Sequence, residues 1–380
     1  MRDRLSVKRW ADGGRRKGRT RLTLIGLVLG LAVGMAPRVG AILLYETGDP
    51  ARNTTAPSGE LEGSGWQWQG RWGSFLGTPI HPKYFLTAAH VGGLVGQALE
   101  LGGVSYVTTF ATNVPGTDLR LWRICGEFTD YAPLRTNGSP VGMTMVCIGR
   151  GTQRGAEVML TNDIGGELRG WRWGARDGVM RWGVNRVEDV YDGGASLGPL
   201  LRATFDADGG VDECHLSVGD SGGAAFVREA GRWELVGIHY AVDGPYSWEA
   251  AGPGFNAALF DHEGFFWQDG GAWVPVTEEG QAEAGSLYIT DVSAHADWIL
   301  EYIQRPVPGE GVPFVQRAEV LGGVYRDVLE AEVDESAGKI LVPLTGVPGY
   351  YRLRGCVSTE ITGVQTNGSS LILSYAVRWE

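Results

Sequence analysis

Glycine is the residue that most constrains the fold of this chain. It accounts for 60 of the 380 residues, and it separates many short runs that are apolar or alternate between apolar and polar residues. Glycine suits tight turns because it adopts positive φ angles at no steric cost. The 14 tryptophans suit half-buried, pleated strands. We therefore predict an all-β fold built from many short strands.

Six runs carry the strand pattern, and glycine or proline separates most of them. They are residues 84–87, 105–110, 119–124, 143–148, 224–227 and 233–241. One helix is expected late in the chain, over residues 293–304. Its apolar face would consist of Ala294, Ala296, Trp298, Ile299 and Ile303. Prolines at 306 and 308 would end it.

The chain divides into five segments. We expect a signal peptide at residues 1–41, an N-terminal arm at 42–64 and the main domain at 65–304. A Pro- and Gly-rich linker follows at 305–311. Residues 312–380 again alternate like strands, which indicates a small C-terminal β-module.

The first segment has the composition of an export signal. A basic cluster at residues 15–21 precedes the apolar run 22–36, and Val39, Gly40 and Ala41 are small residues that suit signal peptidase. We predict a secreted or extracytoplasmic protein. The alternative is a membrane anchor made by residues 22–36, although that run is short of the roughly 20 residues a bilayer requires.

Removal of residues 1–41 would make the protein strongly acidic. These residues carry ten Lys or Arg and two Asp, so the formal net charge of −11 would become −19. A protein of that charge should not bind nucleic acid or anionic lipid non-specifically. The sequence does not indicate the oligomeric state.

Cysteine usage leaves the disulfide pattern open. Cys125, Cys147, Cys214 and Cys356 allow three complete pairings, and the sequence cannot choose among them. Cys356 lies far along the chain in the expected C-terminal module, where an unpaired or buried thiol is an equally good interpretation.

Three segments supply the groups needed for acyl transfer by a serine. His90 ends the apolar run Leu86-Thr87-Ala88-Ala89, Asp118 precedes an alternating run, and Ser221 lies within Gly219-Asp220-Ser221-Gly222-Gly223. A serine hydroxyl is a weak nucleophile, so it needs a histidine base and a carboxylate that orients the base. The glycines would let the Gly219 and Ser221 amides form an oxyanion hole.

These residues resemble the trypsin-like, or chymotrypsin-fold, serine proteases, which share the order His, Asp, Ser. Residues 147–151 are similar to the Cys-x-x-Gly-x-Gly turn of that family, and residues 292–299 are similar to its closing helix. The resemblance covers residues 65–304. It implies two packed six-stranded antiparallel β-barrels with the catalytic residues His90, Asp118 and Ser221 between them.

The chain also departs from the family pattern. Ser217 and Phe226 stand where the family usually has cysteines, and the Arg-Ile-Val-Gly-Gly activation sequence is missing. Asp220 corresponds to the carboxylate that pairs with a freed N-terminal amine in such enzymes. Cleavage after Ala41 would expose Ile42, and whether Ile42 reaches Asp220 is open.

The residues expected to bind substrate argue against trypsin-like specificity. His215 replaces the aspartate that selects Arg or Lys substrates. Residues 236–240 and 255–260 resemble segments of bacterial glutamyl endopeptidases, which implies that His239, helped by Ser217, recognises an acidic P1 side chain. One alternative is that His239 is a satisfied core histidine. Another is that bulky residues at 240 or 242 narrow the pocket for small side chains.

We therefore predict an exported serine endopeptidase that acts on proteins or peptides through an acyl-enzyme. No metal or organic cofactor is expected. The acidic residues between 206 and 213 fit no complete calcium motif and suit a solvated turn better. The rival hypothesis is a binding or scaffold protein on a protease fold, with weak or no turnover.

Overall fold

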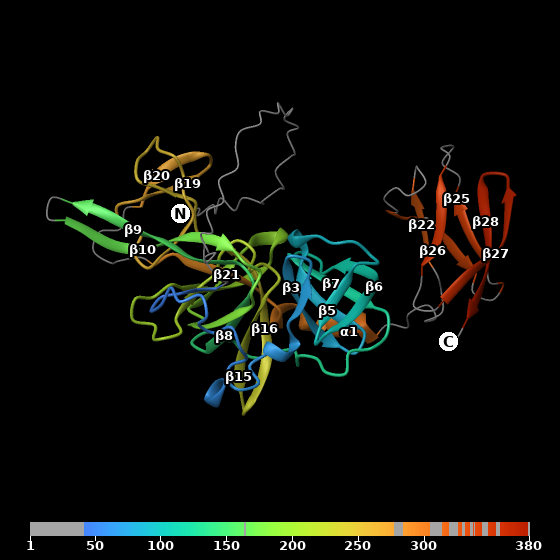
Figure 1. Cartoon of the computed structure of the whole chain (residues 1–380), viewed down its shortest axis with the longest axis horizontal. Coiled ribbons are helices and arrows are strands. Elements are labelled where there is room, and N and C mark those ends of the chain that lie inside the picture. The colour runs from blue at the N-terminus through green and yellow to red at the C-terminus, as the bar shows by residue number, and fades with distance from the viewer. Residues whose placement is uncertain are drawn as a thin grey trace, which may run out of the picture.

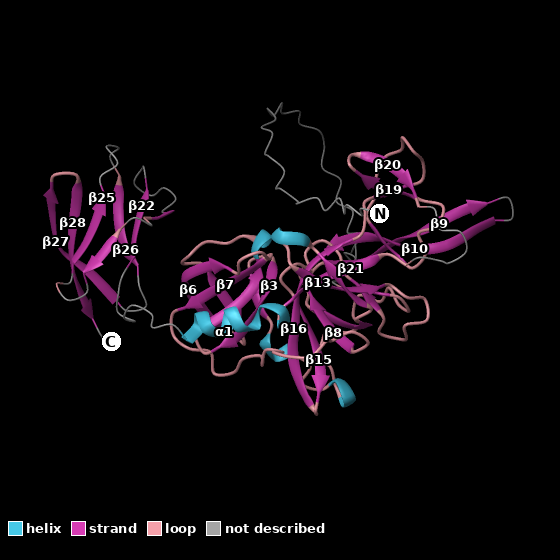
Figure 2. Ribbon diagram, turned by 180° about the vertical axis from the view of Figure 1, so that it is seen from behind, coloured by secondary structure: helices cyan, strands magenta, loops and turns pink. Residues whose placement is uncertain are grey.

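A computed structural model describes most of the chain after the expected signal peptide. The described residues are 42–162, 165–276 and 284–304, followed by 314–318, 326–328, 331–334, 337, 339–343, 349–354 and 358–378. Strands dominate them (Figure 2). The prediction of a mostly β protein is confirmed, whereas the expected signal peptide and the linker at 305–311 lie outside the described residues.

Six strands close into an antiparallel barrel in the order β2-β3-β4-β7-β6-β5 (Figure 1). Their bounds are Gly70–Trp72 (β2), Phe75–His81 (β3), Tyr84–Ala88 (β4), Ala98–Leu101 (β5), Val104–Asn113 (β6) and Leu119–Ile124 (β7). The central strand β4 is buried along its whole length. It pairs at its two edges with β3 and β7, and it is apolar on both faces because Leu86 packs in one hydrophobic cluster and Phe85 in another.

The second half of the main domain contains a seven-stranded antiparallel sheet in the order β11-β8-β15-β16-β21-β13-β12. Its strands are Thr144–Gly149 (β8), Arg181–Arg186 (β11), Asp189–Asp192 (β12), Pro199–Thr204 (β13), Ala224–Glu229 (β15), Arg232–Val242 (β16) and Ser286–Asp291 (β21). The six strand-like runs of the sequence all lie in the barrel or in this sheet. The two barrels implied by the family resemblance are thus seen as one closed barrel and one sheet.

Three small antiparallel groups surround the seven-stranded sheet. The long hairpin of β9 (Thr152–Asn162) and β10 (Gly165–Arg176) extends away from it and pairs with β18 (Ala257–Leu259). A second group contains β17 (Tyr246–Ser247), β19 (Phe266–Asp269) and β20 (Ala272–Pro275). The third pairs β1 (Leu43–Leu44) with β14 (Cys214–His215).

The strand β1 changes the expectation for residues 42–64. Ile42, Leu43 and Leu44 are buried, so the expected arm begins inside the fold. The segment is polar on average, but it begins with three consecutive aliphatic residues. Removal of these side chains from water lowers the free energy of the folded state. The rest of the segment consists of turns and the short 3-10 helix η1 (Gly59–Leu61).

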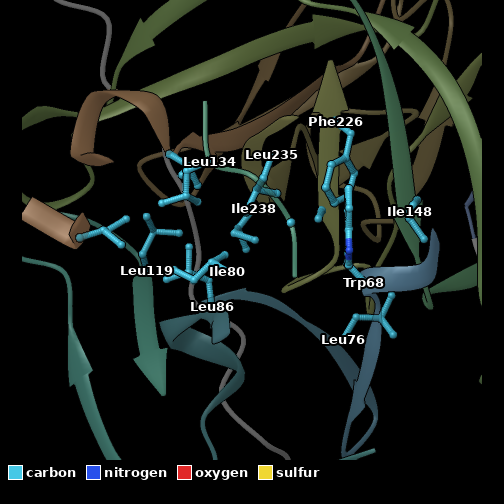
Figure 3. Packing of buried hydrophobic residues seen from close by; sticks show 14 of the residues in the cluster. Trp68, Leu76, Ile80, Leu86, Leu119, Leu134, Ile148, Phe226, Leu235 and Ile238 are labelled. Atoms are coloured by element: carbon cyan, nitrogen blue, oxygen red, sulfur yellow. The ribbon is translucent and has the colours of Figure 1, made fainter. Parts of the chain in front are cut away.

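One hydrophobic core joins the barrel to the seven-stranded sheet. Leu76, Leu86 and Leu119 of the barrel belong to the same buried cluster as Phe226 and Ile238 of the sheet (Figure 3). Continuous burial across the two halves fixes their relative position. Loops that connect to the barrel strands at this core are therefore held close to loops that connect to the sheet strands.

The expected late helix is present. The 3-10 helix η5 (Ser293–His295) leads into α1 (Ala296–Gln304), which together match residues 293–304. Buried Ile299 and Ile303 belong to the common core, and Tyr302 stacks on Phe110 of β6. The helix thus covers the barrel. The other 3-10 helices are η2 (Trp66–Trp68), η3 (Ala89–Val91) and η4 (Gly194–Ser196).

The described part of the C-terminal segment consists of two antiparallel sheets with their own small core of Val315, Ile340, Val342 and Leu373. One sheet contains β22 (Phe314–Ala318), β23 (Arg326–Asp327) and β26 (Tyr350–Arg354). The other contains β24 (Glu332–Asp334), β25 (Lys339–Pro343), β27 (Ser358–Asn367) and β28 (Ser370–Arg378). Strand-like alternation in this segment therefore corresponds to real strands.

The described cysteines are free thiols, namely Cys125, Cys147 and Cys214, while Cys356 lies outside the described residues. Cys147 and Cys214 are fully buried and their thiols share a hydrogen bond. Within the described ranges, no helix is long and apolar enough to cross a membrane.

Candidate active site

His90 lies on the rim of the barrel, where β4 ends. The buried run of β4 passes into η3, whose second residue is His90, and Gly92 then turns the chain away with φ +70°. An apolar strand is anchored by its burial, so the residue just beyond its end is held firmly yet remains exposed. His90 therefore reaches solvent from a rigid support.

Asp118 holds His90 through two separate contacts. Its Oδ2 lies 2.5 Å from His90 Nδ1, and its Oδ1 accepts a hydrogen bond of 3.0 Å from the His90 backbone N–H. The Asp118 carbonyl also accepts the Ala89 N–H at 2.5 Å. With Nδ1 facing a carboxylate, the imidazole carries its proton there, and Nε2 is left to accept one.

Ser221 lies in a tight turn that is built around the buried side chain of Asp220. The Asp220 carboxylate accepts hydrogen bonds from Gly151 N–H at 2.7 Å, from Ser217 N–H at 2.8 Å and from Ser217 Oγ at 2.9 Å. Burial raises the pKa of this carboxyl, while the charge of His239 opposes the increase. The three donors fix the turn and expose Ser221 partly to solvent.

Gly222 brings this turn against the His90 segment. Its N–H donates to the His239 carbonyl at 3.1 Å. A Cβ at Gly222 would lie 2.8 Å from Leu76 O and 3.6 Å from Ala88 N, and φ is +79°. Only glycine permits both this conformation and this approach. Ser221 is thereby placed beside the strand end that carries His90, although no described hydrogen bond joins Ser221 to His90.

The two amides expected to form the oxyanion hole are not used by the hydrogen bonds of the described fold. Among the hydrogen bonds of the described residues, none is donated by the Gly219 or Ser221 backbone N–H. Gly219 has φ +101°, which favours glycine. Two neighbouring amides that are not used by the fold can stabilise an oxyanion next to Ser221.

The three residues expected to bind substrate are all buried. His215, Ser217 and His239 are 1 %, 6 % and 0 % exposed. His215 Nδ1 is 2.7 Å from Leu216 O, and burial lowers the pKa of its imidazole to about 4. Ser217 supports Asp220, and His239 Nδ1 lies 3.2 Å from Asp220 O. Ser217 and His239 thus support the turn from within, and none of the three residues lines an open surface.

Two residues that were named only in open alternatives from the sequence are neighbours of the site. The ring of Tyr240 meets the edge of His90, with centroids 5.8 Å apart. Ile42 lies near Asp220, because a Cβ built on Gly149 would be 2.8 Å from Ile42 Cδ1 and would also touch Asp220 Oδ1. The residue that cleavage after Ala41 would free is therefore close to the buried carboxylate.

Of the acidic residues between 206 and 213, Glu213 anchors the loop internally, whereas Asp208 is exposed as expected for a solvated turn. Glu213 is buried, and its Oε1 accepts hydrogen bonds from Asn185 Nδ2 at 3.0 Å and Asp206 N–H at 3.2 Å. Burial raises the pKa of Glu213 to about 9. Within the described ranges, no group of three or more His, Cys, Asp or Glu side chains is placed to hold a metal ion.

No protein-family model matches this chain, and comparison with curated proteins gives no match. The resemblance to trypsin-like proteases therefore depends on the sequence motifs. The geometry described above adds an oriented histidine, a glycine-rich serine turn and two unused amides, all at the junction between a β-barrel and a second β-sheet.

Proposed function

We propose that this protein is an exported serine endopeptidase of the chymotrypsin type. The observation that carries the proposal is the Asp118 carboxylate, which fixes the tautomer of His90 at the rim that faces the Ser221 turn. Structural histidines do not need this combination of a doubly anchored carboxylate and an exposed imidazole. A general base does.

In the proposed reaction, Ser221 Oγ attacks the scissile carbonyl carbon as His90 Nε2 takes the hydroxyl proton. The carbonyl oxygen becomes an oxyanion that accepts hydrogen bonds from the Gly219 and Ser221 amides. His90 then donates the proton to the leaving nitrogen, which breaks the C–N bond and leaves an acyl-enzyme. Water, deprotonated by His90, hydrolyses the ester and restores Ser221.

The proposal includes the second barrel. Asn185 of the edge strand β11 donates to Thr204 O at the end of β13, at 2.8 Å, and to Cys214 O of β14 at 2.9 Å. Side-chain bonds between strands that are distant in the sheet order support closure of the sheet on itself. Two barrels would then flank the site.

Specificity is proposed to differ from that of trypsin. His215 stands where such enzymes carry an aspartate, and its side chain is buried and hydrogen-bonded to the backbone. A P1 Arg or Lys would therefore find no carboxylate from this position. His239 could recognise an acidic P1 side chain only if its imidazole became accessible, since His239 is fully buried.

An active-site fluorophosphonate probe tests the function directly, because it reacts only with an activated serine. The processed protein should be labelled, whereas Ser221→Ala should lose labelling and at least about 10⁴-fold of its peptidase activity. Ser139→Ala is the matched control, since Ser139 is an exposed loop serine. A folded, processed sample that is not labelled would favour the scaffold hypothesis.

A further inference from the structure

Three arginines gather around the turn between β2 and β3, next to the proposed oxyanion hole. Arg150 Nη1 lies 3.3 Å from Gly73 O, and Arg176 Nη2 lies 3.3 Å from Ser74 O. Arg71 precedes the same turn in β2. We call Arg71, Arg150 and Arg176 the arginine cluster.

Arg176 reaches the reaction centre itself. A Cβ built on Gly219 would lie 2.5 Å from Arg176 Nη2 and 2.8 Å from its Cζ. The guanidinium also packs over the ring of Phe75, with Cζ 5.3 Å from the centroid, which limits its freedom. A positive charge is thus held against the residue whose amide is proposed to bind the oxyanion.

The charge of the cluster is not neutralised by the fold. Within the described ranges, none of the three arginines has an ion pair. Two acidic residues close to the cluster also have other partners: the carboxylate of Asp177 pairs with Arg181, and Glu100, which lies opposite Arg71, accepts a hydrogen bond from Ser105. Burial, followed by the charges of Arg71 and Arg176, lowers the pKa of Arg150, while the charge of Asp177 opposes the decrease.

The repulsion between these like charges costs free energy, and a bound anion would offset that cost. Each guanidinium has five N–H donors in a planar fork. Arg150 and Arg176 each make one described side-chain hydrogen bond, to a backbone carbonyl. The remaining donors suit a carboxylate, which they can bind in bidentate fashion.

The arginine cluster lies on one side of the Ser221 turn. His90 must reach the leaving nitrogen, and His90 belongs to the barrel rim, as does the start of β3 that follows the β2–β3 turn. Sheet order separates the two sides of the Ser221 turn, since β8, which leads to Arg150, and β16, which carries Tyr240, flank β15 on opposite sides. A peptide bound across the Ser221 turn would therefore have one half over the arginine cluster and the other half over Tyr240.

We propose that the arginine cluster binds the carboxylate of a substrate Glu or Asp that follows the scissile bond. This inference rests on the proposed endopeptidase function and assigns its substrate class: peptides with an acidic residue at the first or second position of the leaving group. The mature protein is strongly acidic, so a local basic site beside the nucleophile would give selectivity that the overall charge cannot.

The test compares pairs of peptides that differ only by Glu or Gln at one position. The varied position is one of the two residues before the cleaved bond or one of the two residues after it. Wild-type enzyme should prefer Glu over Gln by about tenfold in kcat/KM at a position after the bond. This Glu/Gln ratio should fall towards one in Arg150→Gln and in Arg176→Gln. Arg186→Gln should keep the ratio, because Arg186 is an exposed arginine that also donates to a carbonyl, at the opposite end of β11 and β8.

Binding of the same peptides to Ser221→Ala supplies a readout without turnover. The Glu peptide should bind more tightly, and addition of Arg176→Gln should abolish the difference. A ratio near one in wild type, a preference confined to positions before the bond, or a ratio unchanged in both arginine variants would overturn the proposal. Absence of both probe labelling and hydrolysis would instead refute the proposed function.

Discussion

Replacement of Asp118 by asparagine tests the catalytic assignment most sharply, because the structure gives the two carboxylate oxygens different partners. Oδ1 accepts the His90 backbone N–H, and Oδ2 faces His90 Nδ1. The backbone partner is always a donor. In Asp118→Asn the amide oxygen must therefore take the place of Oδ1 and accept the His90 backbone N–H. The amide NH₂ then takes the place of Oδ2 and faces His90 Nδ1.

This orientation selects the wrong tautomer of His90. An NH₂ group donates to Nδ1, so the imidazole proton moves to Nε2, which can then no longer accept the Ser221 proton. Reversal of the amide would restore the tautomer but would set NH₂ against the backbone N–H. The loss of these hydrogen bonds and of the negative charge that supports the imidazolium raises the activation free energy by about 4 kcal/mol after allowance for partial exposure. This corresponds to a rate that is about a thousandfold lower.

The assay measures kcat/KM on a peptide substrate and the rate of fluorophosphonate labelling, with urea unfolding as a check on the fold. Asp118→Asn should lose about 10³-fold in both rates while its unfolding free energy changes by less than about 1 kcal/mol. Asp130→Asn is the matched control, since Asp130 caps only the exposed Tyr131 N–H. Retention of more than a tenth of the activity by Asp118→Asn would refute the reasoning.

Three further predictions follow from the same geometry. Gly222→Ala should reduce labelling by at least about tenfold, because its Cβ meets Leu76 O at 2.8 Å at φ +79°; wild-type labelling would contradict the close approach. A chain that begins at Ile42 should be labelled faster than one that retains Ala41, because the freed ammonium can pair with Asp220; equal rates would exclude this pairing. The pKa of Glu213 is raised from 4.5 to about 9, so its contribution to stability is present below about pH 4.5 and lost towards pH 9. Urea unfolding should show that loss between pH 5 and 8 in wild type, by more than about 1 kcal/mol, and not in Glu213→Gln; equal losses would mean that native Glu213 is ionised.

Local patterns in the sequence predicted the elements well. The run at 119–124 coincides with β7, and residues 293–304 form the helix. These segments are specified by neighbouring residues, through alternation in one case and an apolar helical face in the other. The buried strand β1 was missed because three apolar residues are too few to stand out in a polar segment.

The candidate site was only partly accessible to sequence reasoning. His90, Asp118 and Ser221 could be proposed from the sequence because their motifs are short and each is local. The burial of His215 was not foreseen, and the burial of His239 was only one of the open alternatives, since a histidine looks the same in sequence whether it lines a pocket or lies in the core. The arginine cluster was missed for a related reason: Arg71, Arg150 and Arg176 come from three different elements and share no motif.

The sequence by itself determined which groups are available for the proposed chemistry, namely a histidine, an aspartate and a serine in a glycine-rich turn. It also determined the strand content, because turn and strand preferences act over a few residues. Only the tertiary structure decided what surrounds these groups: which histidines are buried, that Ile42 lies near Asp220, and that Arg176 lies beside Gly219 with the charges of Arg71 and Arg150 close to it. Burial and charge clustering depend on contacts between residues that are distant in sequence, and those contacts exist only once the strands have paired and the common core has formed.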